Sequence, residues 1–145
     1  MLATGLPYLS AQTSGHLTVG TPSKIAASRN ASVQTKIPVM VEAGFHVNSN
    51  PPAEENLIPL SIAWSATGAL EAGKITYPKS TKEKVGDQTL TVYTGSFDVI
   101  ANFKVSANAP AGPGAVAGKL RYQACNSTTC FIPKSVEITV PYQIQ

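Results

Sequence analysis

The sequence predicts an all-β protein, an antiparallel two-sheet sandwich of the immunoglobulin-like type. Residues suited to a buried face alternate with polar ones along most of the chain. For example, one face of a predicted strand carries Val33, Thr35, Ile37, Val39 and Val41. Eleven glycines and eleven prolines separate such segments, for example in "NSNPPAEEN" and "NAPAGPG". No window of a dozen residues carries an apolar stripe with helical spacing. Short strands divided by turns favour a sandwich over a barrel.

Seven segments account for the predicted strands. The first alternates over residues 32–47, and the second is a short apolar run interrupted by Pro59. The third and fourth segments are rich in β-branched and aromatic residues. The last three segments are longer, and each alternates over about ten residues. In chain order the remaining six are 57–64, 74–78, 89–95, 96–105, 115–124 and 135–144. We therefore assign residues 32–145 to the immunoglobulin-fold domain and residues 1–31 to an N-terminal arm or edge strand.

Length, charge and hydropathy limit the possible functions. A chain of 145 residues is sufficient for one domain. Charged residues make up 13% and the formal net charge is +3, with no block of basic residues, so nucleic acid is not indicated as a partner. The longest apolar stretch, residues 57–64, is far shorter than the ~20 residues of a membrane span. The first fifteen residues lack the features of a secretory signal, and we expect a trimmed or internal fragment.

The two cysteines offer three interpretations. Cys125 ends one predicted strand and Cys130 precedes the next, with "NSTT" between them. A disulfide here would close a six-residue ring worth roughly 2 kcal/mol, against roughly 4 for a bridge that encloses some 60 residues. No distant cysteine exists to bridge the sheets over Trp64 as in antibody domains. Two cysteines and two histidines fall short of a structural zinc set, so no metal or cofactor is predicted. A structural staple and a redox pair remain equally supported by these residues.

Three stretches resemble the N-terminal periplasmic domain of the thiol:disulfide interchange protein DsbD. The first is "YQACNSTTCFIP" with the following "KSVEITVPYQI". The second is "GFHVNSNPPAEENLIPLSIAW", and the third is "VYTGSFDVIANFKV". The resemblance as a whole extends over about residues 32–145. The resemblance implies a periplasmic electron carrier with an immunoglobulin-like fold. In that role the domain would act as a protein-disulfide reductase.

The resemblance also implies partners. In this family a membrane-embedded reductase domain and a thioredoxin-like domain pass reducing equivalents to the module. The module then reduces periplasmic proteins such as disulfide isomerases and the thioredoxins of cytochrome c biogenesis. The alternative function is a binding or structural sandwich whose disulfide only pins a hairpin. The reduction potential of the cysteine pair distinguishes the two, because structural bridges lie below about −300 mV.

Residue roles follow from the same resemblance. Cys130 matches the cysteine that forms the mixed disulfide with partners, and Cys125 matches the resolving cysteine. Four neighbours are expected to support the pair or face the partner, and these are Tyr122, Gln123, Phe131 and Pro133.

Two further residues are candidates for the surroundings of the pair. His46 aligns with a family strand beside the disulfide. Residues 78–88 correspond to the family's cap loop and include Glu83, but they contain no aromatic residue to shield the cysteines. His16 lies in the N-terminal arm, and we expect no role for it.

Overall fold

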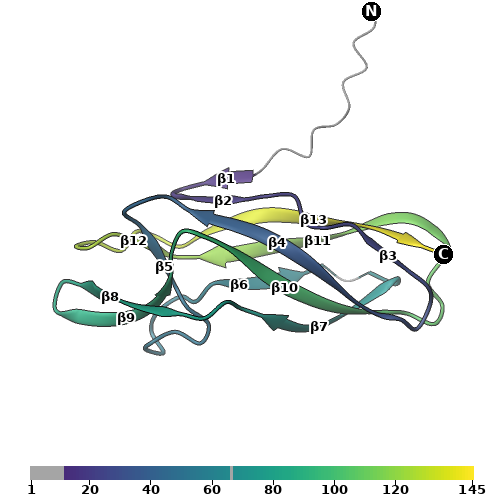
Figure 1. The fold of residues 1–145 in the computed structure, drawn as a ribbon, viewed down its shortest axis with the longest axis horizontal. Coiled ribbons are helices and arrows are strands. Elements are labelled where there is room, and N and C mark those ends of the chain that lie inside the picture. Colours follow the sequence, from purple (N-terminus) through teal and green to yellow (C-terminus); the bar gives the residue numbers. More distant parts are fainter. Residues whose placement is uncertain (1–11, 66) are drawn as a thin grey trace, which may run out of the picture.

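The computed structural model describes residues 12–65 and 67–145, and this part of the chain is folded entirely from strands and turns (Figure 1). None of its segments is a helix that could span a membrane. The strands are β1 (Gln12–Ser14), β2 (Leu17–Val19), β3 (Ile25–Ala27), β4 (Ser32–Val41), β5 (His46–Asn48), β6 (Ser61–Trp64), β7 (Leu70–Thr76), β8 (Thr81–Val85), β9 (Gln88–Tyr93), β10 (Ser96–Val105), β11 (Gly112–Tyr122), β12 (Ala124–Cys125) and β13 (Lys134–Ile144).

Two sheets form the body of the sandwich. One has the strand order β1-β2-β4-β10-β7 and the other β3-β13-β11-β6. The long pairs β4–β10 and β11–β13 are antiparallel, the latter in unbroken register from Gly112 opposite Ile144 to Tyr122 opposite Lys134. Only β3, which pairs with β13, runs parallel to its neighbour among the described strands. The predicted immunoglobulin-like antiparallel sandwich is confirmed.

A third, smaller sheet closes one end of the sandwich. Its order is β12-β5-β9-β8, and Figure 1 shows these strands at the end away from the C terminus. Because β12 holds Cys125, this sheet positions the cysteines. Leu90, Val92 and Cys125 are buried but lie outside the main core cluster. The small sheet therefore buries side chains of its own in addition to those that it contributes to the core.

The core follows from the alternation that the sequence shows. Ile37, Val39 and Val41 of β4 are buried while the residues between them are exposed. Val99 of β10 and Leu120 of β11 are likewise fully buried. Because successive side chains of a strand point to opposite faces, each long strand buries every second residue between the sheets. Burial of each such aliphatic side chain contributes roughly 1.5–3 kcal/mol.

A glycine allows the tryptophan to pack on the core. Trp64 lies edge-on to Phe103, with ring centroids 5.0 Å apart. Gly118 is the cross-strand partner of Trp64, and a Cβ atom at this position would lie 2.6 Å from the indole. Any side chain at residue 118 would therefore displace the ring.

Several predicted boundaries differ from the structure. The first predicted strand is divided into β4 and β5 by a turn at Gly44, whose φ of 87° suits a residue without a Cβ atom. Of residues 57–64 only the second half, β6, is a strand. Residues 12–27 contribute β1, β2 and β3 to the two main sheets. The division of the chain at residue 31 into an arm and a domain stays a prediction.

Candidate functional site

The two cysteines form a disulfide at the end of the sandwich. The Sγ atoms of Cys125 and Cys130 are 2.10 Å apart and their Cα atoms 4.0 Å apart. The predicted proximity is confirmed, since a bridge requires Cα atoms closer than about 7 Å. Strand β12 presents Cys125 after β11, and Cys130 faces it in an isolated antiparallel bridge. The pair thus joins the two arms of a small loop.

The two sulfur-bearing residues differ in exposure. Cys125 is fully buried, at 0% relative accessibility, whereas Cys130 is exposed. Exchange requires the attacking thiolate to approach a disulfide sulfur directly. A protein partner therefore has access to Cys130 and not to Cys125.

The loop between the cysteines has hydrogen bonds of its own. The Asn126 Oδ1 atom accepts from the backbone N–H of Thr128 at 3.0 Å and of Thr129 at 2.8 Å. The Asn126 N–H donates to the Thr129 carbonyl at 2.8 Å. An asparagine that accepts from the backbone two and three residues later stabilises a tight turn. The loop is therefore held by its backbone as well as by the S–S bond.

Gln123 connects the segment after Cys130 to the small sheet. Its Nε2 donates to the Phe131 carbonyl at 3.1 Å, and its Oε1 accepts from Asn48 Nδ2 at 3.3 Å. The Phe131 N–H donates to the Ala124 carbonyl at 2.8 Å. Gln123, a predicted site residue, lies one residue from β12 and holds the chain that follows the exposed cysteine.

His46 lies directly beside Cys125. The antiparallel pairing of β5 and β12 places His46 opposite Cys125. The histidine is only 5% exposed, and among the described residues nothing forms a hydrogen bond with its Nε2 atom. Burial lowers the pKa of His46 from its usual 6.5, and the negative charge of Glu83 partly opposes this shift. The imidazole is therefore neutral at neutral pH.

The segment expected as a cap loop is a β-hairpin instead. Residues 78–88 contain β8, which pairs with β9 from Thr81 opposite Val92 to Val85 opposite Gln88. The N–H of Gly86, in the hairpin turn, donates to the Ser127 carbonyl in the cysteine loop at 3.1 Å. The sequence prediction failed because charged residues on an exposed strand alternate less visibly than apolar ones. Glu83, on β8, lines a groove of about 530 Å³ together with His46.

Aromatic rings near the cysteines come from other parts of the chain. His16 stacks on Phe45 with centroids 3.8 Å apart and an interplanar angle of 8°. The ring centroid of Phe131 lies 5.3 Å from that of His16 and 6.0 Å from that of Phe45. The His16 Nδ1 atom contacts the Glu42 carboxylate at 2.7 Å. The sequence predicts no role for His16, and no local signal in it indicates that this ring stacks on Phe45 and lies beside Phe131.

A hollow of about 430 Å³ lies beside the exposed cysteine. Its lining includes His16, Tyr122, Cys130, Phe131 and Ile132. The hydroxyl of buried Tyr122 donates to the Gly15 carbonyl at 2.8 Å, and this bond fixes the turn between β1 and β2 as one wall. Ile132 is 77% exposed, which is unusual for a large aliphatic side chain. Pro133, a predicted site residue, is also exposed and directly follows Ile132 in the sequence.

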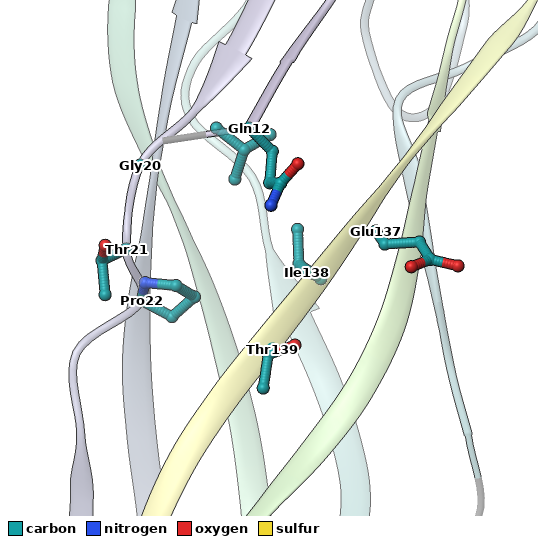
Figure 2. A pocket seen from close by; sticks show the side chains of 8 residues that line it. Gln12, Gly20, Thr21, Pro22, Glu137, Ile138 and Thr139 are labelled. Carbon is teal, nitrogen blue, oxygen red and sulfur yellow. The ribbon is translucent and has the colours of Figure 1, made fainter. Parts of the chain in front are cut away.

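The remaining features near the surface carry no comparable chemistry. Figure 2 shows a hollow between β13 and the segment around Gly20, Thr21 and Pro22. It measures about 60 Å³ and contains none of the predicted site residues. In residues 12–65 and 67–145, His, Cys, Asp and Glu do not gather in a group that could hold a metal ion.

The sequence profile of the family "Thiol:disulfide interchange protein DsbD, N-terminal" matches residues 17–141. The chain belongs to this family. The match confirms the resemblance seen in the cysteine segment and also covers β2 and β3. Together with the disulfide, membership in the DsbD N-terminal family supports thiol-disulfide exchange as the activity. No curated protein matches the chain by sequence.

Two solved structures of N-terminal domains align with this chain. The N-terminal periplasmic domain of ScsB from Proteus mirabilis aligns with a TM-score of 0.65 and 14% identity, over 90% of this chain and 50% of that one. This chain thus spans half the length of that protein chain. The reduced form of the Neisseria meningitidis DsbD N-terminal domain aligns with a TM-score of 0.46 and 16% identity, over 81% and 86%. The ScsB alignment supports the fold.

Proposed function

We propose that this domain is a periplasmic thiol-disulfide exchange module that carries reducing equivalents through Cys125 and Cys130. The observation that carries the proposal is the contrast between an exposed and a fully buried cysteine in one disulfide. A bridge that served stability alone would gain nothing from exposing one sulfur. An exchange module needs one sulfur for the partner and a second, protected one for the return step.

In the reducing direction the reaction has two steps. The Cys130 thiolate attacks a disulfide of the partner, forms a mixed disulfide and releases one partner thiolate. Cys125 then attacks the Cys130 sulfur, so the internal disulfide closes and the second partner thiolate leaves. Two electrons pass from the cysteine pair to the partner. A donor dithiol reverses the sequence and restores the reduced module.

The partners are thioredoxin-like domains and periplasmic disulfide proteins. The exposed Ile132 and the half-buried Phe131, which line the hollow beside Cys130, offer an apolar contact surface for such a protein. The hydrogen bond from Gln123 Nε2 to the Phe131 carbonyl holds this surface in place relative to Cys130. The donor is a membrane-embedded or thioredoxin-like reductase domain, in keeping with the family.

The test is the reduction potential of the Cys125–Cys130 couple, measured by equilibration with glutathione or dithiothreitol buffers. An exchange couple is expected above about −300 mV, in the range of working thiol-disulfide proteins. A potential below that value would support the alternative, in which the disulfide only pins a hairpin. The variant Lys119→Ala, which changes an exposed residue of β11 paired with Glu137 and Ala63, serves as the control and should keep the wild-type potential.

A further inference from the structure

We propose that His46 is the proton acceptor for the Cys125 thiol, and that it assists the step in which Cys125 displaces the partner from Cys130. This inference rests on the exchange function proposed above and assigns a chemical role to a histidine beside the buried sulfur. Three features carry it, namely the strand register, the unpartnered ring nitrogen and the charge on the neighbouring hairpin.

The strand register brings the two side chains together. His46 and Cys125 are directly opposite each other in the β5–β12 pair. Side chains at opposite positions leave the same face of a sheet with Cβ atoms about 4.5–5.5 Å apart. An imidazole and a thiol attached at that separation are within reach of a hydrogen bond. Both residues are buried, and a hydrogen bond is stronger in such low-dielectric surroundings than in water.

The Nε2 atom of His46 is a buried nitrogen that lacks a hydrogen-bond partner among the described residues. Most buried polar atoms in proteins have a hydrogen-bond partner, so this nitrogen is an exception. The structure is that of the disulfide form, in which the sulfur of Cys125 carries no hydrogen. Reduction supplies the missing donor, because a Cys125 thiol has an S–H group and a neutral imidazole has one acceptor nitrogen.

The charges around His46 suit a base that gains a proton briefly. Burial holds the pKa of His46 below its usual value, so the ring is neutral and able to accept. Glu83, on β8, favours the imidazolium that forms after transfer. The groove that His46 and Glu83 line also contains Glu42 and Lys84. This groove connects the ring with solvent, to which the proton passes after the exchange.

The proton of the Cys125 thiol moves to His46, and the resulting thiolate attacks the Cys130 sulfur of the mixed disulfide. The S–S bond between Cys125 and Cys130 forms while the bond from Cys130 to the partner breaks. The electron pair of that bond leaves with the partner as a thiolate. The two cysteines of the module end oxidised, the partner ends reduced, and the imidazolium releases its proton to water.

The test follows the reduced protein as it reacts with 5,5′-dithiobis(2-nitrobenzoate) in a stopped-flow instrument. The first thionitrobenzoate is released when Cys130 attacks the reagent, and the second when Cys125 closes the disulfide. In His46→Phe and His46→Gln we expect the second phase at pH 7 to slow by about tenfold or more, a modest value for general-base catalysis. The pH midpoint of that phase should rise, and the first phase should change by less than about twofold.

Thr35→Val is the matched control, since it replaces another buried polar side chain, one that donates to the Ser23 carbonyl away from the cysteines. It should leave both phases unchanged. An unchanged second phase and pH midpoint in both His46 variants would overturn the role of His46 and leave the exchange function intact. Equal slowing of both phases would also overturn it, because the ring would then act through the fold. Release of only one thionitrobenzoate by the wild-type protein would instead refute the exchange function itself.

Discussion

Reduction of the disulfide should leave the sandwich folded, with only a modest loss of stability. The bridge joins residues five positions apart in sequence, so it closes a ring of residues 125–130. Such a ring restricts the unfolded chain by about 2 kcal/mol in the chain-entropy estimate. A domain of this size is typically stable by ~5–15 kcal/mol. The module can therefore keep its shape in both redox states, as a carrier must.

The hydrogen bonds of the loop support this expectation. Asn126 accepts from two backbone N–H groups within the loop, and Phe131 donates to Ala124 across its base. Gln123 binds the Phe131 carbonyl from outside the ring. None of these bonds depends on the S–S bond. We expect the two arms of the loop to stay together when the sulfurs are reduced.

The assay is thermal unfolding by circular dichroism with and without a phosphine reductant. With an unfolding entropy of about 2.1 cal/mol/K per residue, 2 kcal/mol corresponds to a decrease in Tm of about 7 °C for 145 residues. The Cys125→Ala/Cys130→Ala variant should unfold close to the reduced protein and should not respond to the reductant. Alanine is preferred over serine because a hydroxyl buried at residue 125 would lack a partner. Loss of the cooperative transition on reduction, or a decrease above about 20 °C, would refute the reasoning.

Four further predictions concern the site and the core. Cys125→Ala should trap a mixed disulfide with a thioredoxin-like partner on a non-reducing gel, whereas Cys130→Ala should not; equal trapping by both would contradict the assigned order of attack. Because burial lowers the pKa of His46, the unfolded chain binds this proton more readily, and stability should fall as the pH drops below about 6.5. Glu83→Gln should lower the pKa of His46 further in an NMR titration, since it removes the charge that raises it; an increase would be inconsistent with the geometry. Gly118→Ala should reduce the Tm by several degrees, because its methyl group would collide with the indole ring, and an unchanged Tm would show that the ring moves without cost.

The long strands could be predicted because their signal is local. In β10 and β13 every second residue is apolar, and the predicted limits of β10 agree with the structure. The turn at Gly44 was not predicted, because the apolar alternation of β4 continues past it through Ala43, Phe45 and Val47. Strand β8 was missed because it is exposed along most of its length. A strand that buries little carries little hydrophobic pattern, so its sequence resembles that of a loop.

The sequence by itself determined the strand pattern, the cysteine pair and the family to which that pair belongs. Only the tertiary structure decided which sulfur is exposed, and it placed His16 beside Phe131 and His46 opposite Cys125. These pairs are separated by some eighty residues or more in the chain. Their proximity depends on how distant strands pair and cross, which is set by burial summed over the whole core rather than by any local preference. For this reason a histidine without a local signal forms part of the wall beside Cys130.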